Sequence, residues 1–231
     1  HLTLVHNLRM RWFFRVDPPL WSVATEWQIY FLFPALLWIW RRHGVAPAVV
    51  AGFAFGVGLP LIPRLFTAKP DPSWTLLCPW YVGLFALGMA AAVVGSSDDP
   101  RARWCKDRLP WGALTVGFAA LGFIRLRNFP TEVFPNDAVV GLATACLIVD
   151  CVIRERRGTP EARHPLLRIL NSRTAVALGA FSYSLYLLNY PLLSLAYLLA
   201  RKWILAPGAR LAFSMLVAAP ITVALAYAFH V

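Results

Sequence analysis

Apolar stretches that are long enough to cross a lipid bilayer recur along this chain of 231 residues. A spanning helix needs about 20 apolar residues, because each residue adds about 1.5 Å and the hydrocarbon core is about 30 Å thick. Charged residues, Pro or Gly separate the stretches, which we place at about 20–40, 45–63, 76–95, 111–126, 137–153, 174–200 and 211–231. We expect a tight turn at Gly44 to connect the first two. The sequence therefore predicts an all-α fold, a polytopic transmembrane helix bundle with about seven spans.

The composition excludes an ordinary water-soluble enzyme. Hydrophobic residues make up 59% of the chain and charged residues only 14%, whereas soluble domains carry about 25% charged residues. The four cysteines do not have the spacing of a disulfide framework or of a metal site. We expect them to pack as free thiols: Cys78, Cys105, Cys146 and Cys151.

The net charge of +11 favours a membrane surface over nucleic acid as the partner. Lys and Arg form short clusters between the apolar stretches and not one continuous basic face, and basic residues flank membrane spans in this way. We therefore expect membrane lipids, and no nucleic acid, as partners. We predict that the side carrying 12 of the 22 Lys and Arg residues is cytoplasmic; these 12 are Arg41, Arg42, Arg101, Arg103, Lys106, Arg108, Arg154, Arg156, Arg157, Arg163, Arg168 and Arg173.

Glu26 is a carboxylate about one turn inside the first predicted span. Helical spacing puts Ser22 and Tyr30 on the same face as Glu26. A carboxylate at this depth is costly unless it faces a cavity or a partner. Two interpretations remain open, a carboxylate that lines a polar cavity and orients a base or accepts a proton, or an interfacial Glu that reaches water at the headgroups.

A polar stripe follows the apolar stretch at 174–200. Its members recur every three or four residues, which is the spacing of one helix face. A helix that faces lipid tolerates such a stripe poorly, so we expect it to pack against other helices or to line a passage. The stripe comprises Gly179, Ser182, Tyr183, Tyr186, Asn189, Tyr190 and Leu193.

Other patterns predict packing instead of chemistry. Gly52 and Gly56 are spaced for close helix approach, and Asp150, near the end of the fifth predicted span, is expected to be interfacial beside Arg154. Phosphate-binding Gly-rich loops, HExxH, CxxC and GxSxG are absent from the sequence. ATP-driven transport, zinc proteolysis and elbow-type hydrolysis therefore have no support, and no metal site is expected, whereas secondary transport remains open.

Two segments resemble the acyltransferase-3 family of integral membrane O-acyltransferases. Residues 19–30 read PLWSVATEWQIY and are followed by Phe33 and Pro34, while residues 178–188 read LGAFSYSLYLL. The family signatures run Trp-Ser-hydrophobic-x-x-Glu, then Tyr and Pro, and Gly-x-x-Ser-Tyr-x-x-Tyr-Leu. Residues 4–8 also resemble the approach to the first signature.

The resemblance implies an enzyme of the bacterial cytoplasmic membrane that moves an acyl group, typically acetyl, from a coenzyme A thioester to a hydroxyl of a cell-surface glycan or lipid-linked sugar. By motif position it implies that Glu26 is catalytic. The residues it implies in substrate binding are Trp21, Ser22, Tyr30, Ser182, Tyr183, Tyr186 and Asn189. Asn189 stands where many members have His, and Trp27 stands where many have a second acidic residue. Acyl coenzyme A is then a co-substrate, and no bound cofactor is expected.

The family carries a functional His on its first helices, and no segment of this chain corresponds to them. We therefore expect residues 1–231 to form a single transmembrane acyltransferase-like domain that is truncated at both ends and lacks that base. Two alternatives remain at this point. One is a transporter or channel-like protein without covalent chemistry, and the other is an inactive fragment.

Overall fold

The computed structural model describes residue 7 and residues 19–67, 77–158, 165–203 and 206–230. Within these ranges the regular structure is entirely helical, which confirms the all-α prediction. The chain divides into two compact units. Unit 1 comprises residues 1–24 and 164–231, and unit 2 comprises residues 25–163. The boundary between them falls within one continuous helix, α2 (Leu20–His43).

A tight turn at Gly44 joins α2 to α3 (Val45–Gly58) in unit 2. Gly44 has a φ of 99°, a conformation that costs Gly little but strains other residues. Its amide donates a hydrogen bond to the carbonyl of Trp40 at 2.8 Å, which satisfies one of the last carbonyls of α2. The turn predicted at Gly44 is confirmed. A short helical extension follows α3, made of η2 (Leu59–Leu61) and α4 (Ile62–Phe66).

Helix α3 packs closely on α6 (Tyr81–Ser96), as the Gly52 and Gly56 spacing predicted. A Cβ atom built at Gly52 would lie 3.0 Å from the Cα of Gly83. One built at Gly56 would fall against the Cα of Trp80. The backbones approach this closely only because neither glycine carries a side chain.

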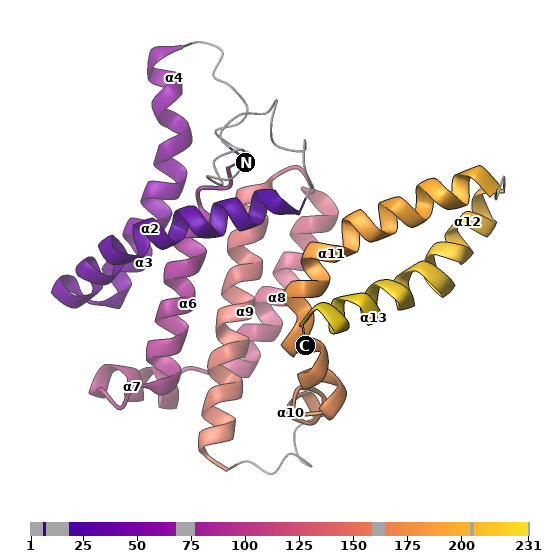
Figure 1. Ribbon diagram of the computed structural model, residues 1–231. Coiled ribbons are helices and arrows are strands. Elements are labelled where there is room, and N and C mark those ends of the chain that lie inside the picture. Colours follow the sequence, from indigo (N-terminus) through magenta and orange to yellow (C-terminus); the bar gives the residue numbers. More distant parts are fainter. Residues whose placement is uncertain (1–6, 8–18, 68–76, 159–164, 204–205, 231) are drawn as a thin grey trace. The chain divides into compact units, whose positions relative to one another are not determined.

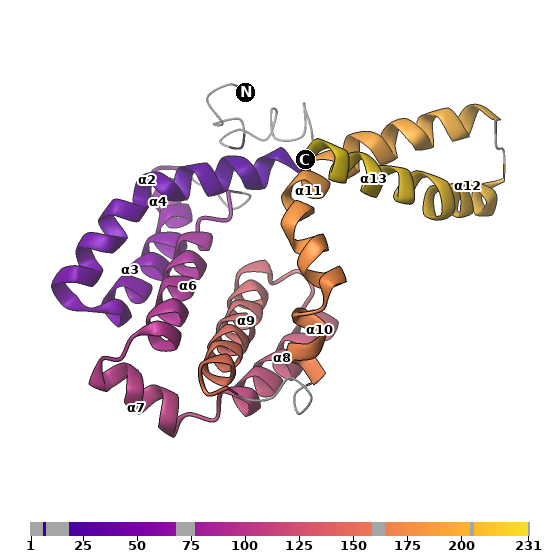
Figure 2. The same ribbon diagram turned by 60° about the horizontal axis from the view of Figure 1, so that its bottom comes forward.

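Two further long helices follow in unit 2 (Figures 1 and 2). Helix α9 (Val133–Arg156) packs on α6, and α8 (Trp111–Asn128) packs on α9. A short basic helix, α7 (Pro100–Arg108), lies between α6 and α8 in the sequence. The sequence predicted only a connection between two apolar stretches here, and the structure has a helix instead. Asp99 caps α7 by accepting a hydrogen bond from the amide of Arg101 at 2.8 Å.

Unit 1 contains a helical hairpin that follows the short helix α10 (Pro165–Leu170). Its first arm is α11 (Arg173–Trp203), and its second arm joins α12 (Pro207–Phe213), the π-helical turn η4 (Ser214–Ala218) and α13 (Ala219–His230). The two arms lie alongside each other (Figure 1). The rings of Phe181 and Tyr227 meet edge to face across them, 5.6 Å apart.

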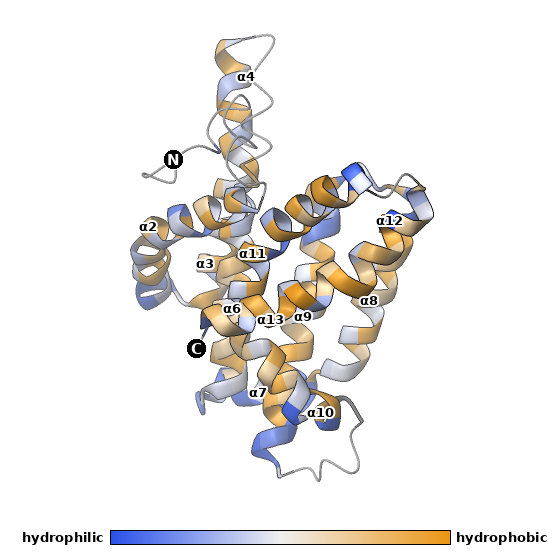
Figure 3. Ribbon diagram, turned by 45° about the vertical axis from the view of Figure 1, so that its right-hand side comes forward, coloured by the Kyte–Doolittle hydropathy of each residue, from blue (hydrophilic) through white to orange (hydrophobic). Residues whose placement is uncertain are grey.

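Helices correspond to all seven predicted stretches, but fewer of them are long and apolar enough to cross a membrane. Among the described residues, three helices are: Val133–Arg156, Arg173–Trp203 and Pro207–His230. Helix α6 is long enough only when it is taken together with α7, and the two helices are bent by 89° relative to each other. Apolar residues run along α9 and α13, and polar residues gather at α7 (Figure 3). The chain is thus an integral membrane protein with three or four candidate spans by length and composition.

Candidate functional site

Glu26 and Tyr30 form a hydrogen-bonded pair on α2. The Tyr30 hydroxyl donates to Oε1 of Glu26 at 2.5 Å, across the one turn that the sequence spacing predicted. Both side chains are exposed within the described structure. A hydroxyl donor of this kind holds the carboxylate in one rotamer. The carboxylate keeps further acceptor sites for a substrate or a base.

Packing against α6 holds the Tyr30 ring. Its edge meets the ring of Phe85 at 6.5 Å, and Phe33, one turn along α2, meets Phe85 at 5.8 Å. The neighbouring Ile29 is only 7% exposed and lies in a core cluster with Val82 of α6. Burial of Ile29 fixes the rotation of α2 against α6, so the Glu26 face is held in register by hydrophobic contact.

Ser22 and Tyr186 meet within unit 1, although 164 residues separate them in the sequence. Their hydroxyl oxygens are 2.5 Å apart, and both can donate to the carbonyl of Pro19, Tyr186 at 3.0 Å and Ser22 at 2.9 Å. The α2 signature and the α11 signature are therefore in contact. Because the two hydroxyls supply only two protons, acceptor sites among the three oxygens stay open to a further donor.

The remaining expected site residues are Ser182, Tyr183, Asn189 and Trp21. Ser182 donates to the carbonyl of Gly179 in its own helix at 2.8 Å. Tyr183 is 55% exposed, and Asn189 is partly buried. Trp21 is partly buried at the start of α2. Of the approach segment at residues 4–8, only Asn7 lies within the described residues, and it is fully buried.

We expect Tyr186→Phe to lower the free energy of unfolding by about 1 kcal/mol, because it removes the hydroxyl that bonds to Ser22 and Pro19. Thermal unfolding in detergent should then occur a few degrees lower, by about 2–4 °C. Tyr183→Phe is the matched control, since Tyr183 lies on the same helix without such a bond among the described residues. Equal melting temperatures for the two variants would contradict the role of the Tyr186 hydroxyl.

A comparison with family models covers both signatures. The family model of the acyltransferase-3 proteins, described as an acyltransferase domain, matches residues 2–231, nearly the whole chain. The chain belongs to the acyltransferase-3 family. Membership makes it an acyltransferase, which decides against a transporter or channel without covalent chemistry. Searches of curated proteins and of solved structures gave no match.

The acyltransferase also contains a carboxylate that the sequence analysis did not single out. The indole Nε1 of Trp80 donates to Oδ2 of Asp137 at 2.9 Å. Asp137 was expected at the start of a span, but α9 begins at Val133, so the carboxylate lies inside the helix. An Asp within an apolar stretch is the signal that could have drawn attention to it, although its partner lies 57 residues away.

Two smaller predictions are confirmed. Asp150 pairs with Arg154, whose Nε lies 2.7 Å from Oδ2 of the carboxylate. All four cysteines are free thiols.

Proposed function

We propose that this acyltransferase moves an acyl group, in the first instance acetyl, from a coenzyme A thioester to a hydroxyl of a cell-surface glycan or lipid-linked sugar. We place it in a bacterial cytoplasmic membrane. The Glu26 and Tyr30 pair carries the proposal, because it presents a carboxylate with open acceptor sites at the position of the family's acidic residue.

The chemistry needs a group that accepts a proton. The sugar oxygen attacks the thioester carbonyl, the new C–O bond forms, and the C–S bond breaks to release the coenzyme thiol. The hydroxyl proton passes to a base, and the leaving sulfur takes up a proton. A sugar hydroxyl is a weak nucleophile, so an oriented base contributes about 10²–10⁴ in rate. We assign to Glu26 the role of catalytic carboxylate, which holds the base in its tautomer and balances the positive charge that the base gains.

The remaining site residues are proposed to bind the acceptor. Hydroxyl and amide groups suit a sugar, because each can donate and accept a hydrogen bond. Ser22 and Tyr186 support this assignment, since they already share a polar cluster at the start of α2. We assign the same role to Trp21, Tyr30, Ser182, Tyr183 and Asn189.

We also propose that α2, the α3–α4 segment, α6 and α8 cross the membrane, which gives seven spans in residues 1–231, within a single acyltransferase domain. Each of them coincides with a predicted apolar stretch. The basic ends of α2 and α9, and α7, would then face the cytoplasm.

Coupled release of coenzyme thiol tests the proposal. Membranes containing the full-length protein are supplied with acetyl coenzyme A and a glycan acceptor, and free thiol and acylated acceptor are both measured. We expect one thiol for each acyl group transferred, and thiol release that depends on the acceptor. Acylation of the acceptor without loss of the thioester would contradict a coenzyme donor.

A further inference from the structure

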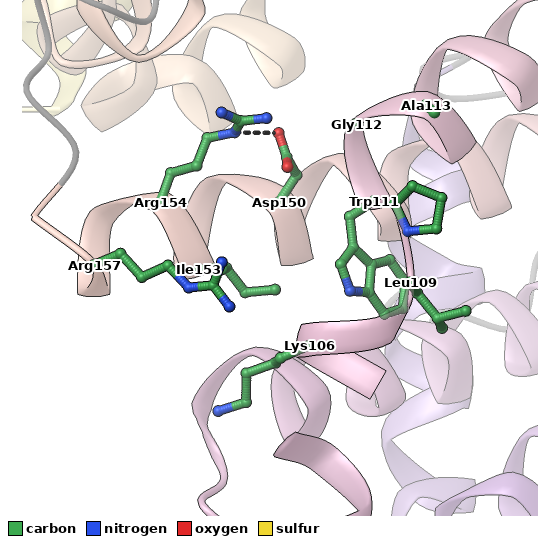
Figure 4. Close-up of a pocket in the computed structure, with 10 residues that line it drawn as sticks. Lys106, Leu109, Trp111, Gly112, Ala113, Asp150, Ile153, Arg154 and Arg157 are labelled. Carbon is green, nitrogen blue, oxygen red and sulfur yellow. Dashed lines mark hydrogen bonds and ion pairs between the residues drawn. The ribbon is translucent and has the colours of Figure 1, made fainter. Parts of the chain in front are cut away.

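A cavity of about 360 Å³ opens in unit 2 between the last turn of α9 and the segment that joins α7 to α8 (Figure 4). Pockets for small ligands start at about this size. Three basic side chains and one acidic side chain line it, namely Lys106, Arg154, Arg157 and Asp150. The lining therefore carries a surplus of two positive charges. The site residues described above do not contribute to it.

The guanidinium of Arg154 is only partly neutralised. Its Nε donates to Asp150 at 2.7 Å, and among the described residues its two terminal nitrogens have no hydrogen-bond partner. An Arg in this state keeps two planar donors available, which suit a phosphate oxygen pair. Gly112 lies beside it, since a Cβ there would be 3.4 Å from Nη2 of Arg154.

Arg157 extends from the end of α9, the helix that carries Arg154, and Lys106 extends from α7 below it in Figure 4. The Lys106 side chain is only 12% exposed, and its ammonium donates to the carbonyl of Ser97 at 2.6 Å. The ammonium also lies 3.8 Å from Oδ1 of Asp98, which does not line the cavity. Arg157 is 59% exposed and donates to Asp107 at 2.8 Å. Asp107 does not line the cavity, so this pair steadies Arg157 without placing a negative charge in the lining.

An aromatic wall completes the cavity. The Nε1 of Trp111 donates to the carbonyl of Cys105 at 3.1 Å, which fixes the indole against the lining.

By contrast, the cavity between α6 and α9 is lined by Asp137 and carries no basic residue. The one along α2 is lined by residues of that helix alone. The cavity at the end of α9 thus differs from these two in having basic lining residues from two helices, Lys106 of α7 and Arg154 of α9.

We propose that this cavity binds a phosphate ester, with Arg154, Arg157 and Lys106 as its phosphate ligands. Two sources share this chemistry. One is the phosphate groups of a coenzyme thioester, in which case the proposal rests on the proposed function. The other is the headgroup of an anionic lipid, because the cavity lies at the end of a candidate span, where headgroups are found.

The test compares Arg157→Gln with Arg156→Gln in the full-length protein in nanodiscs. Both variants remove one positive charge at the end of α9, but Arg156 does not line the cavity and is exposed. Arg157 is also exposed enough for its loss to leave folding intact. One arm measures the binding of coenzyme A in phosphatidylcholine discs. The other measures the rise in melting temperature when phosphatidylglycerol replaces phosphatidylcholine.

We expect Arg157→Gln to weaken coenzyme A binding about tenfold if the coenzyme is the source, or to abolish the stabilisation by phosphatidylglycerol if the lipid is. Arg156→Gln should leave both unchanged. Equal behaviour of the two variants in both arms would overturn the phosphate site. If phosphatidylglycerol stabilises the protein through Arg157 but the protein never consumes acetyl coenzyme A, the proposed function is wrong and the phosphate site stands. If the protein consumes acetyl coenzyme A, but KM and the lipid response are equal in both variants, the proposed function stands and the phosphate site is wrong.

Discussion

Glu26→Gln is expected to lower acyl transfer by at least about 100-fold while the protein still reaches the membrane in normal amounts. The amide keeps the size of the side chain and can still accept a hydrogen bond from Tyr30. It removes the negative charge, however, so a base next to it loses the group that balances its gained proton. The measurement is the initial rate of acceptor acylation at saturating acetyl coenzyme A, corrected for the amount of protein.

Two further variants separate the charge from the packing. Tyr30→Phe removes the hydroxyl but keeps the ring against Phe85, so we expect a loss of only about tenfold. Glu155→Gln removes an exposed carboxylate on α9 and should leave the rate unchanged. Full activity in Glu26→Gln would rule out the catalytic role of Glu26, and an equal loss in Glu155→Gln would show that net charge is responsible.

The features that the sequence predicted correctly are local ones. The Glu26 and Tyr30 pair and the Asp150 and Arg154 pair both follow from residues spaced one helical turn apart. The tight turn at Gly44 was expected between two apolar stretches, and its positive φ suits glycine. These predictions succeed because helix geometry alone decides which side chains are neighbours.

The features that were missed depend on how distant segments pack. Ser22 and Tyr186 lie in separate signatures, and helical spacing does not say which faces of two helices meet. The third apolar stretch was expected from residue 76, but α6 begins at Tyr81, because Cys78 has a φ of 48° and Pro79 follows it. The cavity at the end of α9 needs α7, whose Asp-Pro start at Asp99 was the available signal for a capped helix.

Gly56→Ala is expected to destabilise the acyltransferase by about 2 kcal/mol, which corresponds to a fall in melting temperature of about 4–8 °C. The added Cβ would meet the Cα of Trp80, and it would lie 2.7 Å from the carbonyl oxygen of Pro79. These are backbone atoms, which cannot rotate away as a side chain can. Trp80 is also only 4% exposed and holds Asp137 of α9 through its indole, so a shift at Trp80 is transmitted to α9.

The neighbouring glycines provide graded controls for this prediction. A Cβ at Gly58, the last residue of α3, would meet nothing within 4 Å, and alanine favours the helix by about 0.5–1 kcal/mol over glycine. The Gly58→Ala variant should therefore have the same melting temperature as the unsubstituted protein, or a slightly higher one. Gly52→Ala should fall between the two, since its contacts with the α6 backbone are at 3.0 Å. If Gly56→Ala melts as Gly58→Ala does, the α3 and α6 backbones do not approach as closely as the structure places them.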